Sequence, residues 1–323
     1  MILAGIDEAG YGPLLGPLVV GCCAFELGDV DVRSPLPCLW KRLRKLVSRN
    51  RIRSGRKIHV NDSKQVYSPS IGLKELERSI LILATAGGLT QAQDFTSFVR
   101  DVSMHVLDDL HEYPWYSLDL EKFPLENDGT SLRLFANALR LEMDRSQTHC
   151  IHLAARVVLE RQLNRMVAAT RNKASALFST AAIHLDHLLK TYGEKGLVIV
   201  CDRQGGREHY GSLLRLMFDQ WELEVTSEIS GRSEYRLHRN PHMVRIIFTE
   251  KAEEQAMPVA AASMLCKYLR EVFMHRFNAF WQTHLPEVVP TAGYYNDGER
   301  FLRDIEVKRR ELGIADEDLV RCR

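Results

Sequence analysis

Residues 2–25 read ILAGIDEAGYGPLLGPLVVGCCAF. Two apolar runs, ILAGI and LVVGCCAF, flank a turn rich in Gly and Pro, which predicts two strands joined by a tight connection. Further along, LVIVCD at 197–202 predicts a short apolar strand that ends on a carboxylate. Strands come first and alternate with helices later, so the sequence indicates an α/β sandwich with a mixed sheet.

Other segments carry weaker patterns. Residues 73–86 have helical spacing of apolar side chains, and the region 151–192 lacks Pro and is rich in Ala, Leu and Arg, which predicts helices. Pro258 suits the first turn of a helix running to about Gln282. Residues 221–230 and 242–250 are β-branched or aromatic enough to be strands.

Composition bounds the class of protein. The chain has 323 residues, of which 45% are hydrophobic and 26% charged, and this excludes a disordered or collagen-like protein. The formal net charge is +1, so any affinity for phosphates must come from local patches. The apolar run 13–25 is too short for a membrane span, and Asp7 and Glu8 fall where a secretory signal would need other residues. We therefore expect a soluble, cytoplasmic protein without a membrane partner.

Charge is nevertheless unevenly distributed. Residues 41–57 contain nine Lys or Arg and no acid, which favours either a nucleic-acid surface or a solvated face of an amphipathic helix. Residues 94–128 contain nine Asp or Glu against two basic residues. That acidic segment would repel nucleic acid, so it is a better candidate for a cover or a protein-contact surface.

Cysteine and histidine give little sign of a metal centre. Seven Cys without CxxC spacing argue against a disulfide framework and against a thiolate zinc site. His184 and His187 are three apart on a predicted helix and could share a metal, although two exposed helical histidines are the commoner arrangement.

Acidic residues follow the apolar strands. Asp7 and Glu8 end the first strand, Asp202 ends LVIVC, and Glu253 or Glu254 precedes a helix. Strand ends often carry Asp as a turn residue, but several carboxylates without His or Cys suit hard cations such as Mg²⁺ or Mn²⁺. Such a cluster serves phosphodiester chemistry through two metal ions.

Five blocks, in order, resemble the ribonuclease HII and HIII family. GIDEAGYGPLLGPLVVGC (5–22) resembles its opening signature, and NDSK (61–64) its Asp-Ser-Lys block. LVIVCDRQ (197–204) is similar to the strand carrying its third acid, and EKAEEQAMPVAAASMLCKYLRE (250–271) to the block that leads into Ala-Ala-Ala-Ser, in a form nearer to HIII. AGYY (292–295) resembles the late Gly-Tyr segment.

The resemblance implies a ribonuclease H-like mixed β-sheet flanked by helices, and it implies roles for particular residues. Asp7, Glu8, Asp202 and Glu253 would be the catalytic acids and the ligands of Mg²⁺ or Mn²⁺, with Glu254 in place of Glu253 if the register slips by one. The residues implied to contact substrate are Gly10, Tyr11, Gly12, Ser63, Lys64, Ser263, Lys267 and Tyr294.

The chain also departs from the family pattern. Tyr11 stands where the family usually has Arg or Lys between the glycines, and the opening block begins at residue 5, without the preceding domain typical of HIII. We expect one catalytic domain over 1–323, with an inserted acidic subdomain over about 90–150 that could bind a protein partner.

The resemblance thus implies a metal-dependent endoribonuclease that cleaves the RNA strand of RNA–DNA hybrids and leaves 5′-phosphate and 3′-hydroxyl ends. One alternative is a catalytically silent paralogue that binds hybrid or structured nucleic acid, as Tyr11 and the acidic segment suggest. Another is a two-metal nuclease or phosphatase with a different substrate, since the acids define the chemistry better than the ligand.

Overall fold

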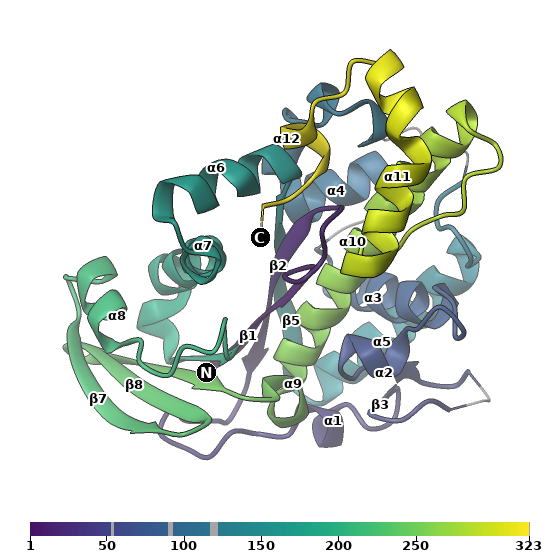
Figure 1. The fold of residues 1–323 in the computed structure, drawn as a ribbon. Coiled ribbons are helices and arrows are strands. Elements are labelled where there is room, and N and C mark those ends of the chain that lie inside the picture. The colour runs from purple at the N-terminus through teal and green to yellow at the C-terminus, as the bar shows by residue number, and fades with distance from the viewer. Residues whose placement is uncertain (53–54, 90–92, 117–121, 323) are drawn as a thin grey trace.

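A seven-stranded mixed sheet forms the centre of the molecule in the computed structural model, which describes residues 1–52, 55–89, 93–116 and 122–322 (Figure 1). The strand order is β5-β2-β1-β6-β9-β8-β7. The strands are β1 (Ile2–Ala9), β2 (Leu18–Leu27), β5 (Thr148–Val158), β6 (Leu197–Asp202), β7 (Glu222–Ile229), β8 (Arg232–Arg239) and β9 (His242–Thr249). A separate pair joins β3 (Val47–Ser48) and β4 (Ile58–His59).

Strand directions divide the sheet into two parts. β1, β2 and β5 form an antiparallel meander, whereas β6 and β9 run parallel to β1. β8 and β7 then extend the sheet by antiparallel pairing beyond β9. The order β5-β2-β1-β6-β9 with these directions is that of a ribonuclease H-like sheet, so the fold class expected from the sequence is confirmed.

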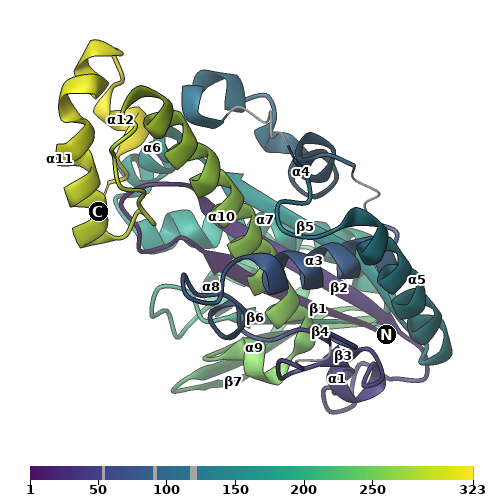
Figure 2. The ribbon, with the colours of Figure 1, turned by 90° about the vertical axis from the view of Figure 1, so that its right-hand side faces the viewer.

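Helices cover both faces of the sheet (Figures 1 and 2). On one face α10 packs against β1 and β2, and α3 and α5 pack against β5; on the other face α7 packs against β1 and β2, and each side has its own apolar core. The longer helices are α3 (Lys74–Ala86), α4 (Phe95–Ser103), α5 (Gly129–Arg145), α6 (Glu160–Thr170), α7 (Lys173–Tyr192), α8 (Gly211–Met217), α10 (Met257–His284) and α11 (Tyr295–Glu311). The four-residue helices are α1 (Leu39–Arg42), α2 (Ser63–Val66), α9 (Ala252–Gln255) and α12 (Asp316–Leu319).

Helix α10 crosses the sheet directly over β1 and β2 (Figure 2). Pro258 occupies its first turn, as expected, and its first ten residues are all buried. Two glycines allow the close approach. A Cβ at Gly5 would lie 2.1 Å from the backbone nitrogen of Val259, and one at Gly21 would lie 2.6 Å from Cys266 Sγ. The helix can therefore bring its side chains to the end of β1.

Some expected elements were wrong. The segment 151–158, expected to be helical, is part of strand β5, because it pairs along β2. Strand β8 was not expected at all, although Ser233, Tyr235 and Leu237 alternate inward along it. The helix expected in the basic run is a single turn, α1.

The acidic segment shares the main core. Phe98, Trp115 and Leu139 belong to the same apolar cluster as α10, and β5 begins within the range 90–150. Residues 90–92 and 117–121 of the expected insert lie outside the described residues. That this segment is inserted relative to relatives, and that it binds a partner, stay predictions.

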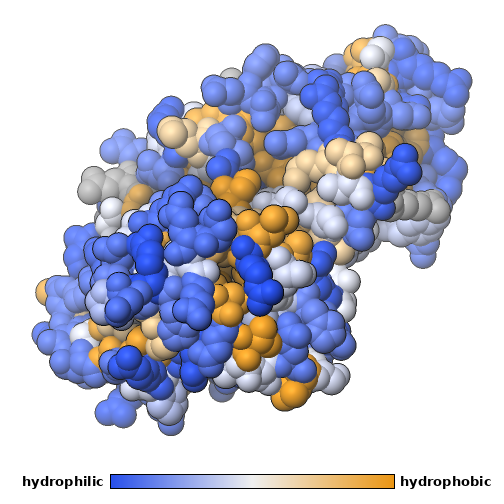
Figure 3. Space-filling view, turned by 90° about the vertical axis from the view of Figure 1, so that its left-hand side faces the viewer, coloured by the Kyte–Doolittle hydropathy of each residue, from blue (hydrophilic) through white to orange (hydrophobic). Residues whose placement is uncertain are grey.

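The surface on the α7 side is mixed in character. Figure 3 shows apolar residues gathered near the middle of this side among hydrophilic ones. Exposed apolar side chains on its elements include Ile183, Leu216 and Ile229. Over the described part of the chain, no helix combines the length and apolarity that crossing a bilayer would require. All seven cysteines are free thiols.

Candidate active site

Three parallel strands deliver the acids to one edge of the sheet. Ile6 of β1 pairs with Cys201 of β6, so Asp7 and Asp202 follow as neighbours, and Asp202 in turn pairs with Thr249 at the end of β9. The chain leaves β9 into the short helix α9, which carries Glu253. In open α/β sheets, ligands bind at the carboxyl ends of the strands where the strand order reverses. Here that position is the end of β1.

Asp7 lies deepest in this cluster. Its side chain is 8% exposed, and Oδ1 accepts the backbone N–H of Glu8 at 2.8 Å. Burial, followed by the charges of Glu8 and Asp202, raises the pKa of Asp7 well above its usual value, although a hydrogen bond from Ser263 opposes the shift. A buried carboxylate of this kind is costly unless a positive charge compensates it.

The other acids share the same unfavourable surroundings. Burial and the charge of Asp202 raise the pKa of Glu8 to about 7, with the nearby Lys64 opposing the shift. Burial also raises the pKa of Asp202 and of Glu253, and Lys64 again acts in the opposite direction. Glu254 is exposed, whereas Glu253 is half-buried and its charge helps to raise the pKa of Glu8. The structure therefore groups Glu253, rather than Glu254, with the other acids.

Helix α2 supplies the polar side chains opposite the acids. Ser263 Oγ and Ser63 Oγ lie 3.1 Å apart, and both serines are buried. Asp62 caps α2 by accepting the backbone N–H of Lys64 at 3.1 Å. Asp62 was not among the site residues predicted from the sequence, yet its charge raises the pKa of Asp202 and of Glu253. Its place in the NDSK block was the available signal.

The glycine turn after β1 (residues 10–16) accepts hydrogen bonds from the buried side chain of Arg321. Arg321 is 2% exposed and donates to the carbonyl oxygens of Gly10 at 2.5 Å and Tyr11 at 3.2 Å. Gly10 has φ +84°, and a Cβ there would meet the Pro17 carbonyl oxygen at 2.5 Å. Gly12 faces open space. No motif marked Arg321, because a basic residue near a terminus is usually solvated.

The ring of Tyr11 contacts the ammonium group of a lysine from another element. The Nζ of Lys173, at the start of α7, lies 5.4 Å from the centre of the Tyr11 ring, within cation–π range. Burial lowers the pKa of Lys173, and burial together with the charge of Glu8 raises that of Tyr11. The turn thus lacks its own arginine or lysine but has a lysine beside it, which the sequence analysis missed.

Among the described residues, Lys267 and the Tyr294 segment contact residues other than the four acids. Lys267 Nζ forms an ion pair with Glu271 at 2.5 Å and lies 4.6 Å from the centre of the Tyr67 ring. Tyr294 is 52% exposed, and the preceding Gly293 carbonyl oxygen accepts the N–H groups of Leu14 and Leu15. The structure brings Tyr294 to the glycine turn, whereas Lys267 is already paired.

The acidic cluster fits a hard divalent cation by its donors. All of its donors are carboxylate oxygens, and Glu8 Oε2 is buried without a hydrogen-bond partner among the described residues. The carboxylate oxygens of the four acids lie further apart than the ligands of one bound ion would. Within the described residues, three His, Cys, Asp or Glu ligand atoms lie within 4.8 Å of one another only at Cys22, His152 and His184. The acids would therefore have to close around an ion.

The raised pKa of Glu8 implies that the folding stability of the metal-free protein depends on pH. Glu8 binds its proton more tightly in the folded chain than in the unfolded one, so stability should fall as pH rises from about 4.5 to about 7. Glu8→Gln should remove this loss, on the order of 3 kcal/mol above that range. Thermal melts with a chelator across these pH values check it. Glu254→Gln, which changes an exposed acid, should keep the wild-type slope, and an equal slope in Glu8→Gln would contradict the assignment.

Strand order and acid placement together define a ribonuclease H-like α/β protein with a carboxylate cluster at the end of its first strand. No family model matches the chain, and none of the curated proteins matches it.

Solved structures of ribonucleases HII and HIII are similar to it. Ribonuclease HII from Archaeoglobus fulgidus, in a complex with PCNA, is 16% identical with a TM-score of 0.44, over 100% of this chain and 95% of that one. Ribonuclease H2 from Pyrococcus horikoshii OT3 is 15% identical with a TM-score of 0.42, over 99% and 92%. Bst-RNase HIII in complex with Mn²⁺ is 16% identical with a TM-score of 0.39, over 99% of this chain and 66% of that one. Likenesses at this level say nothing about activity.

Proposed function

We propose that this chain is a divergent endoribonuclease of the ribonuclease HII/HIII type that cleaves the RNA strand of RNA–DNA hybrids. The observation that carries the proposal is the convergence of Asp7, Glu8, Asp202 and Glu253 at one sheet edge, where burial and the charges of neighbouring acids raise their pKa values. Clustered acids of this kind are unfavourable for folding and are characteristic of functional sites.

Mg²⁺ or Mn²⁺ bound there would activate water and stabilise the leaving 3′-oxygen of a phosphodiester. The protein's own groups would prepare that site. Ser263 orients Asp7 by a hydrogen bond, and Asp202 is fixed by the backbone N–H of Ala252 at 3.2 Å. Products would carry 5′-phosphate and 3′-hydroxyl ends, as the sequence resemblance implies.

Surfaces around the edge suit a nucleic-acid substrate. Lys64 is exposed beside the acids and could contact a phosphate. Arg49, from the basic run, donates to the carbonyl oxygen of Glu254 and stacks on Trp40 with 4.5 Å between its guanidinium carbon and the ring centre. The basic run therefore reaches the same edge, although its Arg53 lies outside the described residues.

The direct test is a metal titration. Chelated protein incubated with end-labelled RNA–DNA hybrid should cut only after Mn²⁺ or Mg²⁺ is added, and the products should carry a phosphatase-sensitive 5′ end. Tight binding of hybrid with no cutting at any metal concentration would instead identify a catalytically silent binding protein and contradict the proposal.

Substrate choice depends on Tyr11. The neutral tyrosine hydroxyl replaces a charge-assisted donor, a loss of about 1.5–3 kcal/mol or one to two decades in rate. A long hybrid offers many registers to recover this contact, whereas one ribonucleotide in DNA offers one. We therefore expect cleavage of continuous hybrids and markedly weaker incision at single ribonucleotides.

Tyr11→Arg should partly recover incision at a single ribonucleotide, by about tenfold. Recovery stays partial because the new arginine lies beside Lys173. Tyr11→Phe keeps the ring under Lys173 and is the matched control, which should not gain incision. The rate ratio of the two substrates is the measurement. An unchanged ratio in Tyr11→Arg, or equal rates in the wild type, would show that Tyr11 does not set substrate choice.

A further inference from the structure

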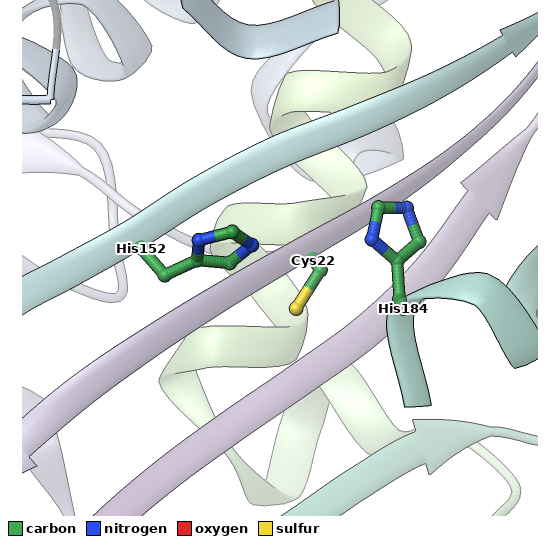
Figure 4. Close-up of side chains that lie close together, drawn as sticks. All are labelled: Cys22, His152 and His184. Carbon is green, nitrogen blue, oxygen red and sulfur yellow. The ribbon is translucent and has the colours of Figure 1, made fainter. Parts of the chain in front are cut away.

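Cys22, His152 and His184 form a second cluster, on the α7 side of the sheet (Figure 4). One ligand atom from each lies within 4.8 Å of those of the other two. Cys22 belongs to the apolar core beneath α7, whereas Cys23 belongs to the core beneath α10. The two neighbouring thiols therefore point to opposite faces, and only the first joins the histidines.

Strand register brings the three side chains together. Cys22 pairs with Ala154 across β2 and β5, and His152 pairs with Ala24, so Cys22 and His152 are diagonal neighbours on one face. His184 reaches the same place from α7, where it is 5% exposed. Because the ligands come from three elements and are up to 162 positions apart, no spacing motif announces them.

The hydrogen bonds leave one ring nitrogen of each histidine available. His184 Nε2 lies 3.0 Å from the Val20 carbonyl oxygen, which can only accept, so Nε2 carries the proton and Nδ1 keeps its lone pair. His152 Nε2 is buried and has no hydrogen-bond partner among the described residues. Figure 4 shows each ring turning a nitrogen toward the space beside the thiol.

We propose that Cys22, His152 and His184 bind one Zn²⁺ ion that ties α7 to strands β2 and β5. One thiolate and two imidazoles are the donors Zn²⁺ prefers, and a water completes the tetrahedron. Zinc–ligand bonds of about 2.0–2.3 Å place tetrahedral ligands roughly 3.3–3.7 Å apart. Because the three atoms lie within 4.8 Å of one another, they need to close by up to about 1.5 Å, which side-chain rotation can supply.

The surroundings favour this role. The Nε2–H bond from His184 to a backbone carbonyl is the usual outer contact of a zinc-bound histidine. His152 is partly exposed and stacks on the exposed His187, at 4.7 Å between ring centres. The sequence left open a metal shared by His184 and His187, whereas the structure places His184 with His152 and Cys22.

Zinc content and the cobalt spectrum of the full chain test the proposal. Purified wild type equilibrated with Zn²⁺ and dialysed should retain about one ion per chain, and Co²⁺ in its place should give a sulfur-to-cobalt charge-transfer band. Cys22→Ser should lose the band and the retained zinc. Cys23→Ser, a buried thiol on the same strand facing the other way, should keep both.

Two further variants keep the outcome decisive. His152→Gln changes a partly exposed side chain that should fold normally, and it should weaken zinc retention at least tenfold. Asp7→Asn alters the carboxylate cluster and should leave the cobalt band unchanged. No charge-transfer band in the wild type, or equal loss in Cys23→Ser and Cys22→Ser, would overturn the site.

Discussion

Asp7→Asn is expected to reduce metal-dependent cleavage of RNA–DNA hybrid by at least about 10³-fold, because it removes a carboxylate charge that would hold the divalent cation, worth several kcal/mol in the transition state. The same change should leave the melting temperature of the metal-free protein equal or higher. Its amide oxygen can still accept the Glu8 N–H, and an uncompensated buried charge is gone. Cleavage activity should therefore fall while the melting temperature stays the same or rises.

Cleavage rates and thermal melts of the same preparations check this. Asp202→Asn should behave in the same way, since burial, followed by the charge of Asp62, raises the pKa of Asp202. Asp186→Asn is the matched control, because that acid pairs with Lys190 on the surface of α7 and should change neither quantity appreciably. Near wild-type activity in Asp7→Asn would show that the acids are not catalytic.

Gly5→Ala is expected to destabilise the fold by about 3 kcal/mol or more, beyond the usual range for overpacking. The added methyl would lie 2.1 Å from Val259 N and 2.3 Å from the carbonyl carbon of Pro258, and both atoms belong to the backbone of α10. A side chain could rotate away, but a buried helix must shift as a whole. That shift would move Ser263 relative to Asp7 and lower activity as well.

Chemical denaturation measures the first effect, and cleavage of hybrid measures the second. Gly12→Ala is the control for stability, because nothing lies within 4 Å of the Cβ position there. A loss of stability in Gly5→Ala no larger than in Gly12→Ala would mean that α10 does not rest on β1 as closely as described.

The sequence predicted those strands and helices whose own residues favour the conformation that they adopt. The apolar runs around Asp7 and before Asp202 predicted β1, β2 and β6, and Pro258 predicted the start of α10. Strand β5 was mistaken for a helix because Ala and Arg favour helices, and only pairing with β2 makes this segment a strand. Propensity describes a segment alone, whereas β5 is defined by its neighbour.

Site residues divide in the same way. The acids could be predicted because each follows a strand, and parallel strands bring such residues to one edge. Lys173 and Arg321 could not, because each reaches the glycine turn from a distant part of the chain. The cluster at Cys22 was excluded by spacing for the same reason, since three elements form it.

The most direct measurement of the central claim compares three labelled substrates, RNA–DNA hybrid, DNA duplex and RNA duplex, with and without Mn²⁺, for wild type and Asp7→Asn. The 2′-hydroxyls in the shallow minor groove of the hybrid should direct cutting to its RNA strand. We expect Mn²⁺-dependent cleavage of that strand alone, lost in Asp7→Asn. Hybrid that stays intact with Mn²⁺, or DNA duplex cut equally well, would contradict the account.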